Sequence, residues 1–189
     1  YQYLIITLAF LLPLTVAGAN LIIFAILFLW FVSGNYGDKL NQIISSKIMV
    51  ASIIFFGIHL VGLIWTENLD WGFHILRKMW YFLLLLPILY TLVKKEFVLY
   101  YKIAFITAIL LIVVTSILIY FELISDDLIA IITTSKNPNP FMSHISYNPI
   151  LAFSIYLVLY EILFIRTHTK TIIFLLIFCA SLMTISMFI

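Results

Sequence analysis

The sequence predicts an all-α protein, a polytopic bundle of transmembrane helices, from its composition and from the spacing of its charges. Of its 189 residues, 65% are hydrophobic and 10% are charged, and the mean hydropathy is +1.22. A soluble domain carries about 25% charged residues, so this chain has too little polar surface to cover a water-soluble globule. Apolar runs separated by charged connectors place the whole chain, residues 1–189, in one transmembrane domain surrounded by membrane lipids.

Composition also excludes several classes of function. The net charge of +2 is small and scattered, which argues against a nucleic-acid partner. The single cysteine, Cys179, lies in an apolar run, so neither a disulfide framework nor a cysteine metal cluster is expected. The chain begins at Tyr1 without a basic leader and stops at Ile189 inside an apolar run, so we expect a fragment of a longer protein. Glycine-rich phosphate loops, HExxH and GxSxG are absent from it.

Six or seven spans are expected. Residues 1–33 are uncharged and too long for one span, which needs about 20 residues. Pro13, Gly18 and Asn20 interrupt this run, so we expect two short helices meeting near 17–20, with one kinked helix as the alternative. A polar connector follows at 34–47. Further spans are expected over 48–65, 78–93, 98–121, 150–165 and 171–189. Prolines at 138, 140 and 149 predict a break in any helix across that segment.

The distribution of Lys and Arg predicts the orientation in the membrane. The connectors at 34–47, 94–102 and 166–170 carry most of these residues: Lys39, Lys47, Lys94, Lys95, Lys102, Arg166 and Lys170. The alternate connectors carry Arg77, Lys78 and Lys136. Because cytoplasmic loops are enriched in positive charge, we expect the first group to be cytoplasmic. The loop at Glu67 and the loop at 137–146 then face outward.

Arg77 and Lys78 oppose this bias, and two interpretations stay open. They are explained structurally if two cations beside a span simply extend to the headgroups. Alternatively they form an outward anion site at the start of a helix, where free N–H groups and the helix dipole add positive potential. A diphosphate at the membrane surface is the ligand expected for such a site.

Other polar and aromatic residues have similar alternatives. His144 and Tyr147 belong to a run of hydrogen-bonding side chains, which is either a Pro/Asn-rich turn or a site where a neutral His acts as a general base or binds a hydroxyl. His59 lies inside a span and is expected to bond to a neighbouring helix. Four aromatics around the first outward loop either anchor the interface or stack on sugar rings: Trp65, Trp71, Trp80 and Tyr81.

Three segments together resemble a known family. They read LPLTVAGANLIIFAILFLW near the start, GLIWTENLDWGFHILRKMWYFLLLLPIL in the middle, and FMSHISYNPILAF further on. In this order they look like the N-terminal half of the O-antigen ligase and O-antigen polymerase superfamily. The resemblance covers nearly the whole chain, although each motif is mostly apolar.

The resemblance implies an incomplete GT-C-like bundle from a bacterial inner-membrane glycosyltransferase. A ligase of this family transfers a glycan from undecaprenyl diphosphate to a lipid A core sugar on the periplasmic side, without a metal or another cofactor. Arg77, Lys78, His144 and Tyr147 match family positions and are the expected substrate-binding residues. The family's catalytic His and key Arg match no position here, so the catalytic residues are not assigned and residues 1–189 alone are expected to be inactive.

Three alternatives stay open. An O-antigen polymerase would use the same donor and another repeat unit as acceptor. A transporter or flippase of a polyprenyl-linked solute would instead need charges deep in its spans and paired broken helices, and the middles of these spans hold almost no charge. A non-catalytic membrane scaffold is the third.

Overall fold

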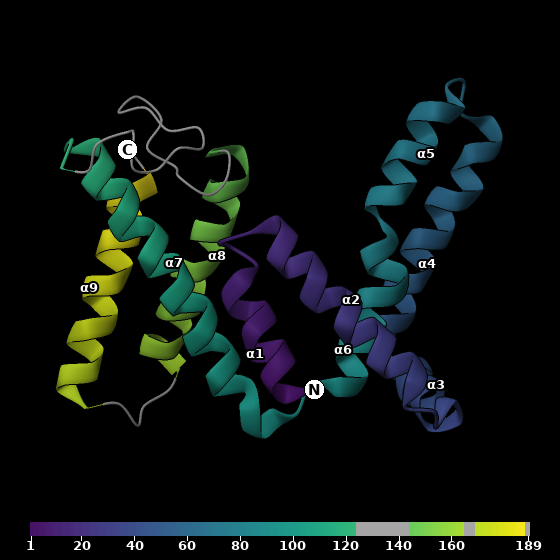
Figure 1. Cartoon of the computed structure of the whole chain (residues 1–189), viewed down its shortest axis with the longest axis horizontal. Helices are drawn as coiled ribbons and strands as arrows, with labels where there is room; N and C mark the ends of the chain where they lie inside the picture. Colours follow the sequence, from purple (N-terminus) through teal and green to yellow (C-terminus); the bar gives the residue numbers. More distant parts are fainter. Residues whose placement is uncertain (124–143, 165–168, 188–189) are drawn as a thin grey trace. The chain divides into compact units, whose positions relative to one another are not determined.

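The structure is a computed structural model, and it describes residues 1–123, 144–164 and 169–187, with the side chains at 144 and 145 left out. Its described elements are helical, which confirms the all-α class (Figure 1). In chain order they are α1 (Gln2–Leu11), α2 (Val16–Val32), α3 (Tyr36–Ser45), α4 (Lys47–Gly62), η1 (Leu63–Trp65), α5 (Leu69–Lys78), η2 (Tyr81–Leu85), α6 (Leu86–Leu92), η3 (Lys95–Phe97), α7 (Val98–Tyr120), α8 (His144–Phe164) and α9 (Lys170–Met187).

The described helices include five that are long and apolar enough to cross a membrane. They cover Lys47–Trp65, Leu69–Leu92, Lys95–Tyr120, Ser146–Phe164 and Lys170–Met187. The bent pair of α2 and α3 makes six if it counts as one span, and α1 is a shorter apolar helix. The span helices leave large apolar side chains exposed, such as Ile48 at 75% and Phe174 at 69%. Patches of this kind are stable in lipid and unfavourable in water, which supports a multi-pass membrane protein.

The chain divides into two compact units. Unit 1 comprises Tyr1–Ile5 and Leu21–Val98, and unit 2 comprises Ile6–Asn20 and Leu99–Ile189. Unit 1 contains most of α2, then α3 to α6 and η3. Unit 2 contains α7, α8 and α9. Each unit is treated separately below.

The first apolar run forms two helices, as preferred from the sequence, but the break lies earlier than expected. α1 ends at Leu11 and α2 begins at Val16, whereas the predicted junction was 17–20. Pro13 has no N–H to donate and ends α1. The Thr15 hydroxyl then accepts a hydrogen bond from the Gly18 N–H (3.3 Å), as an N-terminal capping residue does. Gly18 and Asn20 are tolerated inside α2.

Two further boundaries differ from the sequence prediction. The segment 34–47, expected as a polar connector, contains the amphipathic helix α3. The span expected from 150 is part of α8, which begins at His144 and continues through Pro149. The expectation that Pro149 breaks a helix was wrong: it lies inside α8, where it removes only the bond that its own N–H would have donated four residues back, and α8 continues past it. Pro138 and Pro140 lie outside the described residues.

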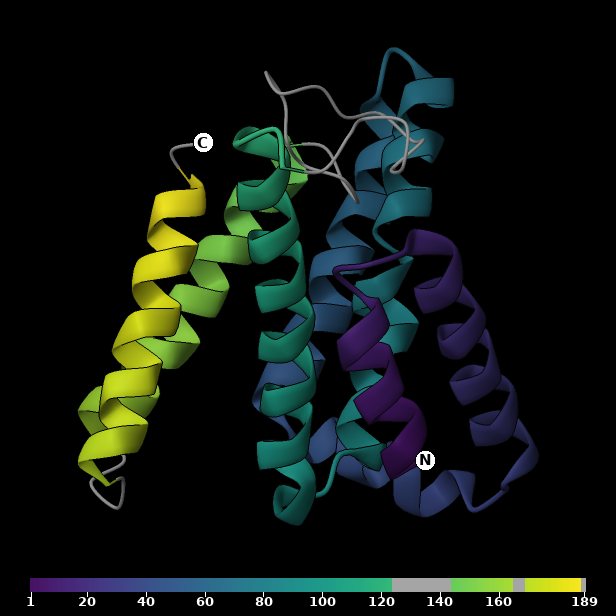
Figure 2. The same ribbon diagram turned by 60° about the vertical axis from the view of Figure 1, so that its left-hand side comes forward.

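Unit 2 is held by an apolar core between α7, α8 and α9. Its fully buried members come from all three helices: Ile109, Ile112, Val113, Tyr147, Leu151, Val158 and Met183. α8 and α9 lie side by side along most of their lengths (Figure 2). This packing aligns the start of α8 with the end of α9.

Candidate functional site: the α4–α5 hairpin

α4 and α5 form a hairpin whose tip is the polar loop expected to face outward (Figure 1). Asn68 begins α5, because its side-chain oxygen accepts a hydrogen bond from the Trp71 N–H (3.0 Å). A Cβ added to Gly72 would lie 2.6 Å from Leu63 Cδ2, so this glycine lets α5 pack closely against the Leu63 side chain of η1. Further along, the Ser52 hydroxyl of α4 donates to the Phe82 carbonyl of η2 (2.6 Å) and keeps these two helices in register.

An open cavity of about 390 Å³ lies between the two helices near the tip. Its lining is mainly apolar and aromatic, with a few polar groups: Ile58, His59, Gly62, Leu63, Trp65, Thr66, Trp71, Gly72, Ile75 and Leu76. Trp65 and Trp71 are 72% and 62% exposed, so both indole rings are accessible from outside. A mostly apolar cavity of this volume with a few polar groups is typical of a small-molecule or sugar site.

Only half of the predicted aromatic group gathers at this cavity. Trp80 and Tyr81 stack on each other, with ring centroids 4.4 Å apart, and neither lines the cavity. They lie about 14–15 Å further along the chain axis than Trp71, from the rise per residue. Trp71 instead stacks on His74, at 5.3 Å between centroids.

Arg77 and Lys78 occupy the last turn of α5, and both side chains are exposed. The expectation that they begin a helix was therefore wrong: α5 already starts at Leu69, because Asn68 caps it. At a helix C-terminus the dipole stabilises the two cations and adds no attraction for an anion. Within the described residues, neither cation has an ion-pair partner, so any anion binding rests on their own charge.

The two cations differ in their position around α5. Lys78 follows Trp71 and His74 at helical spacings of three and four, so these three share one face. Arg77 shares the neighbouring face with Phe73. Neither cation lines the cavity, and both lie roughly 9–10 Å deeper along the helix than Trp71.

His59 also differs from expectation. Its Nδ1 lies 2.8 Å from the Phe55 carbonyl, one turn earlier in the same helix, so this bond stays within α4 and does not reach a neighbouring helix. Its ring packs on Phe55, with centroids 4.6 Å apart. His59 is therefore held by α4 itself and forms part of the cavity wall.

The other two predicted substrate-binding residues belong to unit 2. Tyr147 is 1% exposed, and its hydroxyl lies 2.6 Å from the Ser186 hydroxyl. This places it in the core, and its assignment to substrate binding stays a prediction. His144 is the first residue of α8, and its side chain lies outside the described residues, as do 137–143.

An ion pair in unit 2 was missed from the sequence. Lys102 of α7, placed above among the cytoplasmic connector residues, is bonded to Glu161 of α8. The Glu161 side chain is 10% exposed and the Lys102 side chain 23%. One acidic residue within the apolar run 150–165 was the available signal, since a charge inside a span needs a partner.

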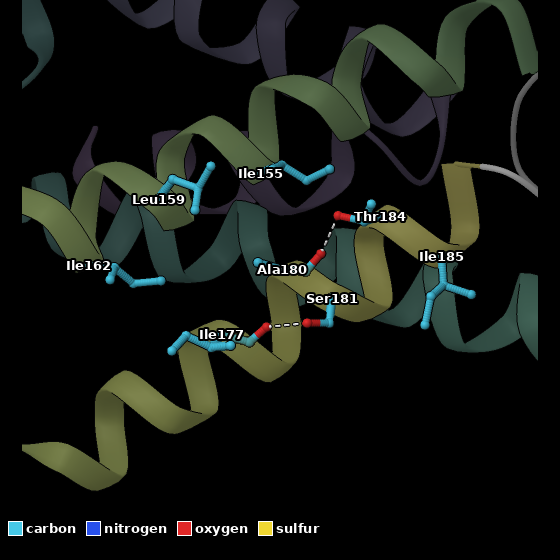
Figure 3. Close-up of a pocket in the computed structure, with 8 residues that line it drawn as sticks. All are labelled: Ile155, Leu159, Ile162, Ile177, Ala180, Ser181, Thr184 and Ile185. Atoms are coloured by element: carbon cyan, nitrogen blue, oxygen red, sulfur yellow. Dashed lines mark hydrogen bonds between the residues drawn. The ribbon is translucent and has the colours of Figure 1, made fainter.

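A second hollow lies between α8 and α9 in unit 2 (Figure 3). It measures about 480 Å³ and is lined by Ile155, Leu159, Ile162, Ile177, Ala180, Ser181, Thr184 and Ile185. The Ser181 and Thr184 hydroxyls donate to the Ile177 and Ala180 carbonyls of their own helix, at 2.9 and 2.8 Å. The hollow therefore offers an apolar surface with no titratable group.

In the ranges that the structure describes, no three His, Cys, Asp or Glu side chains come together as metal ligands. Comparison with known proteins identifies no relative: no family model, no curated protein and no solved structure matches this chain.

Proposed function

We propose that this chain is part of a bacterial inner-membrane glycosyltransferase that moves a glycan from undecaprenyl diphosphate to a lipid A core sugar. The reaction and the GT-C-like architecture are taken from the sequence resemblance to the O-antigen ligase superfamily. In that reaction an acceptor hydroxyl attacks the anomeric carbon with inversion, and the diphosphate leaves. Fixed cations stabilise the negative charge that develops on the leaving group.

One observation supports this proposal from the structure: the order of side chains along the α4–α5 hairpin. Two exposed indole rings and a cavity lie at the tip, two cations follow about two turns deeper, and the apolar segment Tyr81–Leu92 comes last. A prenyl-diphosphate glycan has the same order of chemistry, with sugar outside, diphosphate at the headgroups and prenyl chain in the lipid. Aromatic faces bind sugar rings through their apolar C–H surfaces, and cations bind phosphate.

The test is complementation of a bacterial strain that lacks its O-antigen ligase. The protein is expressed from its complete coding sequence, and lipopolysaccharide is separated on a gel. We expect O-antigen to return to the lipid A core. Its continued absence, with the protein present in the membrane, would contradict the proposal. A polymerase would instead restore long chains in a strain that lacks its polymerase.

A substitution at the cavity makes this test specific. Trp71→Ala should lower glycan transfer roughly two- to tenfold, since loss of an aromatic stacking contact costs about 0.5–1.5 kcal/mol. Trp71→Phe should retain much of the activity. The matched control is Phe73→Ala, because Phe73 is 58% exposed on the same helix and does not line the cavity. Equal losses at both positions would indicate interfacial anchoring in place of sugar binding.

A second candidate function, transport of a polyprenyl-linked or other anionic solute, is favoured by the Lys102–Glu161 pair. Ionisable residues inside spans often mark a path for ions or substrates. In proteoliposomes, a transporter would move a labelled polyprenyl diphosphate between leaflets, and Glu161→Gln would abolish that movement. A transferase would leave the distribution of the label unchanged.

A further inference from the structure

A sharp turn separates α3 from α2 in unit 1. The two helices are bent by 117° across a break of three residues, Ser33 to Asn35. Gly34 and Asn35 both have positive φ, 67° and 54°, and this left-handed pair reverses the path of the chain. Glycine and asparagine are the residues that adopt this conformation most readily. α2 is uncharged and 17 residues long, about 25 Å, which is near the thickness of the hydrocarbon core.

Side-chain contacts hold α3 at this angle. Lys39 Nζ donates to the Trp30 carbonyl (3.0 Å) and to the Ser33 hydroxyl (2.7 Å), and it lies 4.6 Å from the centroid of the Trp30 indole. A cation at the end of α2 satisfies carbonyl groups that the helix leaves free and interacts favourably with its dipole. The Tyr36 hydroxyl donates to the Phe31 carbonyl. The orientation of α3 is therefore determined by the end of α2.

α3 has three distinct faces. One face packs against the rest of unit 1 and carries Lys39 and the buried Ile43. The second carries apolar residues at a spacing of four, namely Tyr36, Leu40 and Ile44, which are 45%, 50% and 67% exposed. The third is polar and exposed, and its members are Asp38, Asn41, Gln42 and Ser45. A helix in water would not keep a row of exposed apolar residues beside a polar face.

The charges around α3 fit a surface of lipid headgroups. Lys47, the first residue of α4, follows α3 after Ser46 and is exposed. Lys94 and Lys95 follow α6, which contacts α3, and both are also exposed. Lysine side chains at the end of spans extend to phosphate groups of the headgroups, and an anionic leaflet attracts them.

We propose that α3 lies in the interface of the membrane and binds the bilayer surface, with Tyr36, Leu40 and Ile44 inserted at the boundary of the acyl chains. The 117° bend after α2 turns the axis of α3 away from the direction of the span and towards the membrane plane, and the polar face is turned to water. The partner is a phospholipid surface with anionic headgroups. This inference is independent of the transferase reaction.

The test measures the depth of single fluorescent labels in the full-length protein, reconstituted in vesicles of phosphatidylethanolamine and phosphatidylglycerol. The native cysteine is first removed by Cys179→Ser. Labels are then attached to Leu40→Cys and Ile44→Cys on the apolar face, and to Asn41→Cys and Ser45→Cys on the polar face as matched controls. Quenching by chain-brominated lipid reports contact with the acyl region, and quenching by aqueous iodide reports contact with water.

We expect labels at 40 and 44 to be quenched several-fold more by brominated lipid than labels at 41 and 45, with the reverse order for iodide. Equal values at all four positions, or iodide quenching that is strongest at 40 and 44, would overturn the proposal. Protection of 40 and 44 from both quenchers would also overturn it, because another protein surface would then cover α3. Cysteine at these exposed positions leaves Ile43 and Lys39 in place, so the fold is retained.

Discussion

The hydroxyl groups of Tyr147 and Ser186 lie 2.6 Å apart and join the start of α8 to the end of α9 inside the core of unit 2. Both side chains are almost fully buried, at 1% and 4% exposed. Ser116 of α7 is also buried, at 1%. A polar contact of this kind within an apolar bundle specifies which ends of two helices align, because any shift leaves a hydroxyl without a partner.

Removing this bond should cost a modest amount of stability. We expect Tyr147→Phe and Ser186→Ala each to lower the free energy of unfolding by about 0.6 kcal/mol, the average for interhelical hydrogen bonds in membranes. The double variant should lose less than the sum of the two, since both changes remove the same bond. Unfolding in detergent measures this, with Tyr156→Phe as control, because Tyr156 is 60% exposed on the same helix. Strictly additive losses would show that the two hydroxyls act independently.

Replacing Lys102 should destabilise the protein more than replacing its ion-pair partner Glu161. Lys102→Met removes the cation from a buried carboxylate and should destabilise the protein by about 3 kcal/mol. Glu161→Gln should cost less, because the more exposed Lys102 can extend towards water. The combined variant Lys102→Met, Glu161→Gln should recover most of the stability of the native protein. The quantity measured is folded protein in detergent extracts at increasing temperature, and a combined variant no better than Lys102→Met alone would refute the pairing.

Membrane orientation can be tested at the tip of the hairpin. In a Cys179→Ser background, Glu67→Cys should react with a membrane-impermeant maleimide in intact spheroplasts. Lys94→Cys should react only after the membrane is permeabilised, because positively charged connectors stay in the cytoplasm. The opposite pattern of labelling would invert the orientation and place the aromatic cavity inside the cell.

The fold class followed from composition, but several boundaries did not. The helix pair in residues 1–33 was predictable, and Thr15 after Pro13 was the signal that would have placed its break. Asn68 and Asp70 similarly indicate the start of α5, as a capping residue and an acidic residue in the first turn, although a dense polar run is also typical of a loop. α3 was missed because its apolar residues at 36, 40, 43 and 44 form a helical period within only ten residues.

The sequence predicted which residues belong to the candidate site, but it did not predict how those residues are arranged in space. The sequence indicates that Trp65, Trp71 and the two cations belong to one outward hairpin. It does not indicate that α4, η1 and α5 enclose a cavity lined by Gly72 and Leu63, because that depends on the register of the two helices. The burial of Tyr147 depends on α9, which lies 39 residues further along the chain at Ser186. Contacts of this kind follow from tertiary packing, which local patterns do not specify.

If the α4–α5 hairpin binds a glycan-linked diphosphate, substitutions at Arg77 should change the rate of glycan transfer. A guanidinium group binds phosphate oxygens through two parallel N–H bonds, which a lysine cannot reproduce. A charge-assisted hydrogen bond is worth about 1.5–3 kcal/mol, so its loss should lower turnover roughly ten- to a hundredfold. Arg77→Lys should be partly impaired and Arg77→Ala more so.

The deciding measurement is glycan transfer per unit of membrane-inserted protein, for the native protein, Arg77→Lys and Arg77→Ala expressed from the complete coding sequence. We expect specific activity to decrease in that order at equal protein levels in the membrane. If Arg77 only extends to the headgroups, lysine replaces it fully and alanine lowers abundance alone. Equal specific activity in all three proteins would therefore contradict a role for Arg77 in binding the diphosphate.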